Sequence, residues 1–245
     1  MAAEGMPALL CGMVGSTLGW TVAPYLDCPI DLEGLRRGLM DVGDGVRIVP
    51  GLKGPGLAGQ PEVMRGEETQ AFGWLAVDAS RCRGRRLICH PGTHAKWIVT
   101  DAGRVERFLT AMTGELFAVL SKHSVLKTEA APDDSAAFEE GLEAAGDGAG
   151  LASRLFTART RVVAGDASPD SSASYLSGLL IGAEVASVPT LLDGEPDGPV
   201  ALVGDPRLCR WYEIALARAG WEVERFDGDA AALAGLKALM EGRDG

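Results

Sequence analysis

Carboxylates are concentrated in residues 64–70, with the sequence MRGEETQ, at the predicted start of a helix. Glu67 or Glu68 could accept the proton of a substrate hydroxyl, because a positioned carboxylate is a suitable general base. Arg65 could pair with a substrate carboxylate through two parallel hydrogen bonds. The alternative is that the glutamates only complement the helix dipole. The segment therefore predicts either a general base or a purely structural helix start.

A second group of polar residues lies in residues 91–96, with the sequence PGTHAK, at a predicted tight turn between two strands. Gly92 allows a ligand to approach the backbone closely, and the successive N–H groups of such a turn can bind a phosphate. Thr93 adds a hydroxyl donor, while His94 and Lys96 add charge. The turn thus predicts a phosphate-binding hairpin, with an ordinary polar hairpin as the alternative.

Glycines mark two further places where a nucleotide could approach the backbone. Gly178 and Gly182 lie four residues apart in a predicted helix. The smooth stripe that they leave either packs against another helix or supports a nucleotide ring. Gly204 lies between a predicted strand and a helix, where the first N–H groups of a helix often meet a ligand. The same position is equally an ordinary strand–helix turn.

Residues 54–59, with the sequence GPGLAG, match the G-x-G-x-x-G pattern of dinucleotide-binding folds. Pro55 interrupts the pattern, and no helical period begins before about Arg65. We therefore expect a flexible loop here, and an NAD-dependent oxidoreductase is the less favoured alternative. The pattern G-x-x-x-x-G-K-[ST] does not occur, which excludes a kinase of the P-loop class.

Composition excludes several classes of protein. The 245 residues include 34 acidic and 23 basic side chains, a formal charge of −11. This balance argues against general binding to nucleic acid or to an anionic membrane, and no run of 18 apolar residues indicates a membrane span. Five cysteines without C-x-x-C spacing and three scattered histidines predict neither a disulfide framework nor a zinc site. We expect a soluble, cytoplasmic protein that binds anions through a few local cations and backbone N–H groups.

The elements that must position these residues follow an α/β order. The predicted strands are Leu9–Val14, Val46–Val49, Leu87–His90, Lys96–Thr100, Val105–Leu109, Pro199–Gly204 and Trp221–Phe226. Predicted helices begin near Arg65 and at Thr113, which would act as the cap, span Ala136–Ala145, Gly150–Val163 and Ser172–Ser187, and follow each of the last two strands. A loop is expected at residues 51–56 and a linker at residues 80–86.

This order predicts two lobes. From residue 87 onward it consists of three strands, several helices, and then strand, helix, strand and helix. Residues 1–86 have only the tail of such a unit. We therefore expect a duplicated fold with lobes at residues 1–86 and 87–245, the first lacking its opening meander. The start at residues 1–4, directly before a buried strand, fits this expectation.

Several motifs together resemble one family, the 2-dehydro-3-deoxygalactonokinases, over nearly the whole chain. They are CGMVGS at 11–16, MRGEETQ at 64–70, PGTH at 91–94, MTGELF at 112–117 and SYLSGLLIGAE at 174–184. The family belongs to the sugar-kinase, Hsp70 and actin superfamily. The resemblance implies a two-lobed, actin-like ATPase fold with duplicated RNase H-like sheets and ATP between the lobes. The first lobe would lie on the sugar-acid side and the second on the nucleotide side.

The resemblance also implies an activity, namely transfer of the ATP γ-phosphoryl group to the 6-hydroxyl of 2-dehydro-3-deoxy-D-galactonate in galactonate catabolism, with Mg²⁺. Gly92, Thr93 and His94 match the second phosphate-binding hairpin of the superfamily, and Lys96 would grip phosphate oxygens. Gly204 matches the region that usually holds adenosine. Gly178 and Gly182 are assigned to the nucleotide as well.

For the sugar acid, the resemblance assigns the catalytic role to Glu67 or Glu68, with Glu67 slightly favoured, where related kinases commonly use aspartate. Arg65 would pair with the sugar-acid carboxylate, and the substrate-binding residues would further include Gly15, Ser16 and Thr69. The hairpin and the helix that begins with the glutamates should then face each other across one nucleotide cleft.

One departure from the family pattern affects the expected activity. The family opens with an acidic, Gly- and Thr-containing turn resembling DWGTT, which holds Mg²⁺ and the ATP phosphates, and nothing similar occurs in this sequence. Because phosphoryl transfer depends on positioning and charge neutralisation, the alternative function is that of a truncated, impaired kinase that only binds the sugar acid or nucleotide. The expected partners are small molecules, and the oligomeric state is left open, a homo-oligomer included.

Overall fold

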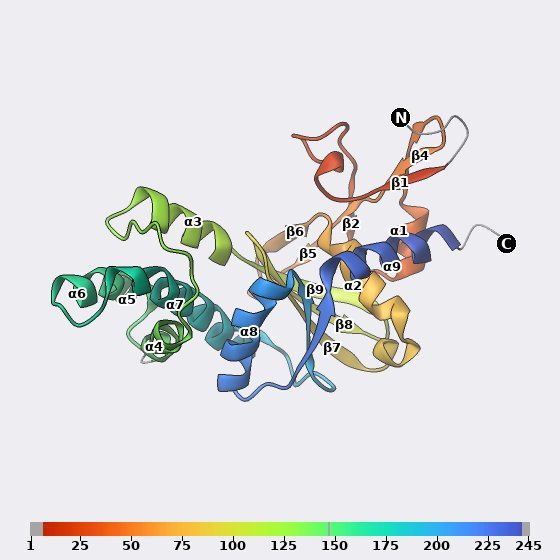
Figure 1. The fold of residues 1–245 in the computed structure, drawn as a ribbon. Helices are drawn as coiled ribbons and strands as arrows, with labels where there is room; N and C mark the ends of the chain where they lie inside the picture. Colours follow the sequence, from red (N-terminus) through yellow and green to blue (C-terminus); the bar gives the residue numbers. More distant parts are fainter. Residues whose placement is uncertain (1–6, 147, 242–245) are drawn as a thin grey trace.

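The largest sheet contains the meander that the sequence predicts after residue 86. The computed structural model describes residues 7–146 and 148–241. Strands β7 (Arg85–His90), β8 (Ala95–Asp101) and β9 (Arg104–Ala111) pair antiparallel, and β10 (Val200–Gly204) and β11 (Val223–Asp227) continue the sheet in parallel, in the order β11-β10-β7-β8-β9 (Figure 1). The predicted meander is thus confirmed, and the fold is α/β.

Both faces of this sheet are buried, which explains why its strands are apolar at successive positions. Leu87 and Cys89 of β7 point into one apolar cluster, whereas Ile88 between them points into another. The first cluster contains Trp211 and Tyr212 of α8 (Pro206–Arg218). The second cluster is covered by α2 (Glu67–Val77) and α9 (Gly228–Glu241).

A group of helices extends from one side of this sheet (Figure 1). Its members are α3 (Thr113–His123), α4 (Ser135–Ala145), α5 (Leu151–Leu155), α6 (Thr157–Val163) and α7 (Ser172–Ser187), with short 3-10 turns η3 (Pro169–Ser171) and η4 (Val188–Leu191). The single helix predicted over residues 150–163 is wrong, because it is divided into α5 and α6 at Phe156. Thr113 does not cap α3 as predicted, since its hydroxyl donates to Glu184 instead.

The first part of the chain forms two smaller sheets. One contains β1 (Ala8–Leu10), β4 (Val46–Ile48) and β3 (Met40–Gly43), and the other contains β2 (Tyr25–Asp27), β5 (Gly51–Pro55) and β6 (Pro61–Met64). The 3-10 turn η1 (Gly12–Gly15) and the helix α1 (Leu32–Arg37) lie between these strands in the sequence. The strand predicted over residues 9–14 therefore ends at Leu10, and β2, β3, β6 and α1 were not predicted.

The loop expected at residues 51–56 is a strand instead. Leu52 is fully buried, and β5 pairs with β2 on one side and with β6 on the other. Gly51 is required there because a side chain would meet the Tyr25 ring and the Met64 carbonyl oxygen, each 2.6 Å from the position of a Cβ atom. Its glycine content thus reflects close packing rather than flexibility.

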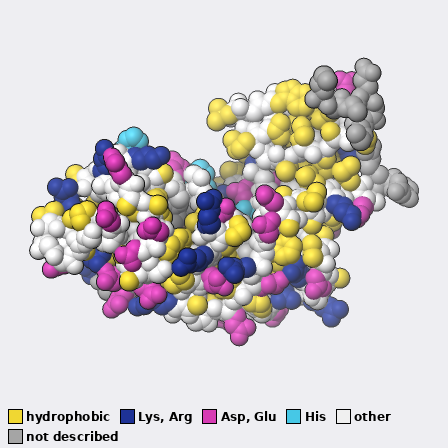
Figure 2. All heavy atoms as spheres, viewed as in Figure 1, with side chains coloured by type: hydrophobic (Ala, Val, Ile, Leu, Met, Phe, Trp, Pro, Cys, Tyr) yellow, Lys and Arg dark blue, Asp and Glu magenta, His cyan; other side chains and the backbone are white. Residues whose placement is uncertain are grey.

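The segment after β1 exposes several large apolar side chains. Leu18 is 89% exposed, and Met13, Trp20 and Val22 are more than half exposed. Figure 2 shows hydrophobic side chains gathered on this end of the molecule, near β1 and β4. This segment therefore contributes little to the apolar cores.

The two parts of the chain are joined by backbone bonds and by helix packing. Ile30 and Val105 exchange both of their N–H···O bonds, at 3.0 and 2.8 Å, which attaches the first part to β9. Helix α2 packs on α9 through Gly73 and Gly235. The expected linker contains a 3-10 turn, η2 (Ala79–Cys82), and then enters β7.

The division at residue 86 stays a prediction, and one apolar core contains residues from both sides of it. Residues 1–6, which include the predicted late start, and residues 242–245 lie outside the described residues. Among the described helices, none is both long and apolar enough to cross a membrane.

Helices α4 and α7 touch through glycine backbones, and this contact generates a stability prediction. A methyl group at Gly178 would overlap the Phe138 carbonyl, 3.0 Å from its carbon and closer still to its oxygen. We expect Gly178→Ala to lower the free energy of unfolding by about 1–3 kcal/mol, measured by chemical denaturation. Gly146→Ala is the control, because its methyl group would meet only ordinary contacts at 3.6 Å or more. Equal stability of the two variants would contradict this packing.

Candidate functional site

The start of α2 is shaped by a glycine with a left-handed backbone. Gly66 has φ +110°, and a side chain there would approach the Cα atom of Gly12 at 3.3 Å. The turn η1 therefore lies directly against the residue that precedes the two glutamates. Both carboxylates fold back to the backbone ahead of the helix, as in a helix cap: Glu67 accepts from Arg65 N (3.1 Å) and Glu68 from Gly66 N (2.7 Å).

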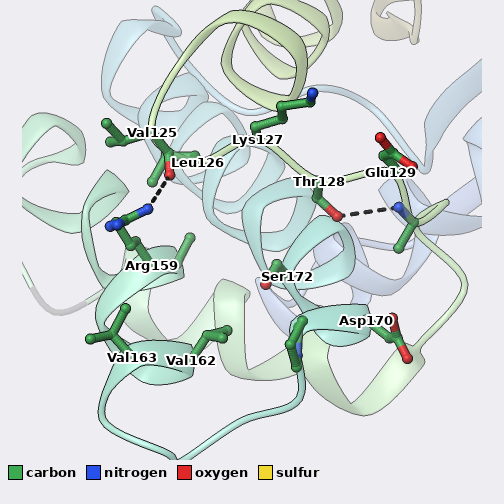
Figure 3. A pocket seen from close by; sticks show the side chains of 13 residues that line it. Val125, Leu126, Lys127, Thr128, Glu129, Arg159, Val162, Val163, Asp170 and Ser172 are labelled. Atoms are coloured by element: carbon green, nitrogen blue, oxygen red, sulfur yellow. Dashed lines mark hydrogen bonds between the residues drawn. The ribbon is translucent and has the colours of Figure 1, made fainter.

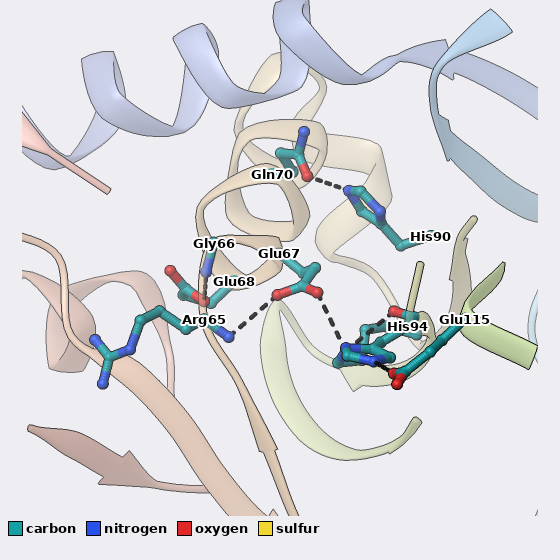
Figure 4. Close-up of polar contacts among 9 residues, drawn as sticks. Arg65, Gly66, Glu67, Glu68, Gln70, His90, His94 and Glu115 are labelled. Carbon is teal, nitrogen blue, oxygen red and sulfur yellow. Dashed lines mark hydrogen bonds and ion pairs between the residues drawn. The ribbon is translucent and has the colours of Figure 1, made fainter. Parts of the chain in front are cut away.

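The two glutamates have different surroundings (Figure 4). The Glu67 side chain is 21% exposed and forms an ion pair with Lys96 Nζ at 3.2 Å. Glu68 is completely buried, and Thr69 donates its hydroxyl to Glu68 at 3.2 Å. Burial, followed by the nearby charge of Glu67, raises the pKa of Glu68 to about 8. At neutral pH Glu68 therefore holds a proton, while Glu67 faces a cation.

The predicted phosphate hairpin is the turn between β7 and β8, and the start of α3 packs on it. Thr93 O accepts from Glu115 N at 2.9 Å, and a side chain at Gly114 would meet Gly92 O at 2.5 Å and the Cα atom of Thr93 at 2.8 Å. His94 is bonded to Glu115 through Nε2. The turn is thus supported on one side by the first residues of a helix, whose N–H groups favour anions.

Lys96 connects this hairpin to α2. Its side chain is buried, and Nζ donates to His94 O at 3.1 Å in addition to its ion pair with Glu67. The hairpin and the glutamate-led helix, which were expected to face each other across one nucleotide cleft, thus touch directly through Lys96. The cleft between them stays a prediction. Sequence reasoning identified Lys96 but not its carboxylate partner.

Helix α2 also contacts β7, and this contact was not predicted from the sequence. Gln70 Oε1 is bonded to Nε2 of His90, and Gln70 Nε2 donates to Gly228 O at 3.0 Å (Figure 4). Burial is the main cause that lowers the pKa of His90. Gln70 thus ties α2 to β7 and to the start of α9. The signal in the sequence was the position of Gln70 one helical turn after Glu67.

Arg65 does not point toward Glu67. Its guanidinium donates to Ala23 O at 2.8 Å and stacks on the Tyr25 ring, with 4.3 Å from Cζ to the ring centroid. Figure 4 shows the Arg65 side chain extended away from Glu67. Gly15 lies against Arg65 Nη1, and the hydroxyl of Ser16 accepts from Leu18 N. Arg65 and Gly15 are therefore brought together, whereas pairing of this guanidinium with a ligand beside Glu67 needs another side-chain conformation.

The glycines assigned to the nucleotide differ in their accessibility. The surface at Gly178 and Gly182 is covered by α4, since a side chain at either position would meet atoms of Phe138 or of Leu142 and Ala145. The assignment of these two glycines to ATP is corrected, because helix packing fills the stripe. Gly204 lies within ordinary contact distance of Pro91 O, so the turn between β10 and α8 adjoins the hairpin.

A cavity of about 220 Å³ lies beside the hairpin. Its wall is mostly apolar and includes Gly92, Gly114, Phe117, Ser177, Leu208 and Trp211. No cavity was expected there from the sequence, because the lining residues come from five separate segments. Its size and lining suit a flat aromatic group.

Buried polar contacts hold the wall of this cavity in place. Glu184 of α7 accepts hydrogen bonds from Trp97 Nε1 (2.7 Å), from the Tyr212 hydroxyl (2.7 Å) and from the Thr113 hydroxyl. The carboxylate thus joins β8, α3, α7 and α8. The signal in the sequence was a single glutamate in an otherwise apolar helix, which sequence reasoning quoted only as part of a motif.

A larger cavity, of about 330 Å³, lies among residues 125–130 after α3, helix α6 and η3 (Figure 3). Its wall includes Leu126, Lys127, Arg159 and Asp170 and contains none of the predicted site residues. Among the described residues, no group of three or more His, Cys, Asp or Glu side chains could hold a metal ion. The hairpin, the start of α2 and the adjoining cavity are therefore the best candidate site.

Comparison with known proteins decides the family. The sequence model described as 2-keto-3-deoxy-galactonokinase matches residues 1–239. The chain belongs to this family. It is 37% identical to the 2-dehydro-3-deoxygalactonokinase of Escherichia coli (strain K12) over 238 residues, which are 96% of this chain and 79% of that protein.

Two further relatives agree. DgoK1 of Rhizobium meliloti (strain 1021), a probable 2-dehydro-3-deoxygalactonokinase, is 39% identical over 243 residues, which are 95% of this chain and 77% of the relative. A crystal structure of a proposed 2-dehydro-3-deoxygalactonokinase from Sinorhizobium meliloti superimposes with a TM-score of 0.87 at 34% identity, covering 98% of this chain and 81% of that one. The predicted 2-keto-3-deoxy-galactonokinase family is thus confirmed in both sequence and fold.

The buried Glu68 generates a prediction for this kinase family member. The unfolded chain releases the Glu68 proton near the ordinary glutamate pKa, whereas the folded chain releases it near pH 8. Between these values the folded state binds more protons, so stability falls as pH rises. We expect Glu68→Gln to flatten this decline, measured as the free energy of unfolding at pH 5 and pH 8. Glu139→Gln, at an exposed position of α4, is the control, and an identical decline in all three proteins would refute the assignment.

Proposed function

We propose that this chain is a 2-dehydro-3-deoxygalactonokinase that transfers the γ-phosphoryl group of ATP to the 6-hydroxyl of 2-dehydro-3-deoxy-D-galactonate. The observation that carries this proposal is the ion pair between Lys96 and Glu67, which brings a carboxylate to the predicted phosphate hairpin. Family membership supplies the substrate and the reaction. The structure supplies the positions of the reacting carboxylate and of the phosphate hairpin.

In this mechanism Glu67 orients the attacking hydroxyl and accepts its proton. Its carboxylate is partly exposed at the hairpin and forms an ion pair with the ammonium group of Lys96. Glu68 is unsuited to this role because it is buried and keeps its own proton at neutral pH. Glu68 instead fixes the Gly66 backbone from which Glu67 extends.

ATP would be bound by the hairpin and the adjoining cavity. The N–H groups of Gly92 and Thr93, the Thr93 hydroxyl and Lys96 are suitable donors for phosphate oxygens. Since Gly92 also lines the cavity of about 220 Å³, a nucleotide held at the turn can place its base there. His94 and Gly204, which adjoin the same turn, would complete the phosphate and ribose surroundings.

Mg²⁺ fits this site as a companion of the nucleotide. Bound with a nucleotide, the ion takes most of its ligands from phosphates and water and needs only one or two carboxylates. The carboxylate of Glu115 contacts the hairpin through His94 and would hold the ion. When bound, the ion neutralises the charge of the phosphates.

The sugar acid would lie on the other side of Glu67, where η1 packs against Gly66. Gly15 and Ser16 belong to this region, and Arg65 supports it by holding the backbone at Ala23. Thr69 was assigned to the substrate as well, but its side chain is completely buried and its hydroxyl donates to Glu68. Pairing of Arg65 with the substrate carboxylate stays a prediction.

The architecture supports the same proposal. The five-stranded sheet, with three antiparallel strands followed by two parallel ones and their helices, has the RNase H-like order expected of an actin-like lobe. We infer that residues 1–86 belong to the first lobe of this fold and residues 87–245 to the second. The incompleteness of the first lobe, the cytoplasmic location and a homo-oligomeric state stay predictions from the sequence.

The catalytic assignment generates a prediction for Glu67. We expect Glu67→Gln to lower kcat by about 10²- to 10⁴-fold, because the general base is lost, while the sugar acid still binds. An ATP-coupled assay gives kcat, and isothermal titration gives the affinity for the sugar acid.

Glu68→Gln is the matched comparison, because the two glutamates are neighbours and only Glu67 would accept the proton. It should retain most of the activity, since the amide resembles the protonated acid. Equal activity of the two variants would exclude Glu67 as the base. Binding of the sugar acid by the unaltered chain without phosphorylation would instead support the alternative function of a binding protein.

A further inference from the structure

Glu184 determines which hydrogen bonds two hydroxyl groups at the cavity beside the hairpin can make with a ligand. Thr113 and Tyr212 both line the cavity, and both donate their hydroxyl protons to the Glu184 carboxylate. A hydroxyl has a single proton to donate, so these two groups can only accept hydrogen bonds from a ligand. Neither can therefore donate to a ring nitrogen of a base.

Ser177 is the remaining side-chain hydroxyl of the cavity wall. It lies on α7, is 8% exposed, and makes no hydrogen bond to any residue in the described part of the chain. Elsewhere on this helix, the Ser174 hydroxyl accepts from Asp134 N and the Ser187 hydroxyl donates to Glu184 O. The Ser177 hydroxyl is therefore free both to donate a hydrogen bond to a ligand in the cavity and to accept one from it.

The surrounding wall favours a flat aromatic ligand at this hydroxyl. Phe117, Leu208 and Trp211 offer apolar surface, and Ile181 continues it one helical turn after Ser177. A purine base presents both donors and acceptors at its edge, and a free hydroxyl can meet either. The cavity thus combines apolar contact area with one uncommitted polar group.

We propose that Ser177 supplies the side-chain hydrogen bond to the base of the nucleotide and so contributes to the base preference of the site. This assignment rests on the proposed function, because it takes the cavity beside the hairpin as the place of the base. Ser177 binds and orients the nucleotide, and no proton or phosphoryl group is transferred to it.

The test compares two ligands, ATP and inorganic tripolyphosphate, which lacks the base. We expect Ser177→Ala to weaken ATP binding by about 3- to 10-fold, the usual range for one neutral hydrogen bond. Binding of tripolyphosphate should be unchanged. Isothermal titration of each ligand without sugar acid measures both affinities, and kcat at saturating ATP should stay as in the unaltered chain.

Ser187→Ala is the matched control, since Ser187 lies on the same helix outside this cavity. Unchanged ATP affinity in Ser177→Ala would overturn the proposal, and so would an equal loss for both ligands, which indicates general damage. If the unaltered chain binds ATP but does not phosphorylate the sugar acid, the proposed function fails while the result for Ser177 still stands. If it binds no ATP, both fail.

Discussion

The arrangement of the candidate site depends on one ion pair between a buried lysine and a carboxylate. Lys96 is only 4% exposed, and an ammonium group in such surroundings is costly unless a carboxylate and further hydrogen-bond acceptors compensate it. Glu67 and the carbonyl of His94 provide this compensation. The pair therefore fixes the distance between the hairpin of the large sheet and the first turn of α2. Because removing either partner leaves the other unpaired, both are needed for the same geometry.

The sequence was informative where local pattern and tertiary environment agree. The meander from β7 to β9 is apolar at successive positions and is bounded by turn residues, and the structure buries it on both faces as such a run requires. The glutamate-led helix was predicted for similar reasons, because Gly66 and the two glutamates form a local signal. Strand β5 was missed because Gly51, Gly54 and Pro55 favour a loop locally, while packing of Tyr25 and Met64 requires a residue without a side chain. Tertiary contact decided that element.

The residues of the candidate site were likewise predicted only where a local pattern in the sequence indicated them. Residues of the hairpin and of MRGEETQ could be selected by type and spacing, but the partner of each charge could not. Lys96 meets Glu67 and His94 meets Glu115 only after folding, over separations of 29 and 21 residues in the chain. Glu184 and the cavity wall come from five segments, so no local pattern predicts them. Gly178 and Gly182 show the reverse error, since a stripe of small residues fits both a ligand and a helix, and here a helix occupies it.

The contact between α2 and α9 has a consequence for the far end of the chain. Gly235 lies so close to Thr69 that a side chain would overlap the Thr69 carbonyl, and Gln70 reaches the Gly228 carbonyl at the start of α9. Helix α9 thus supports the first turn of α2. Proteolytic removal or displacement of α9 would therefore disturb the start of α2 and with it the proposed active site, although no atom of α9 needs to contact a substrate.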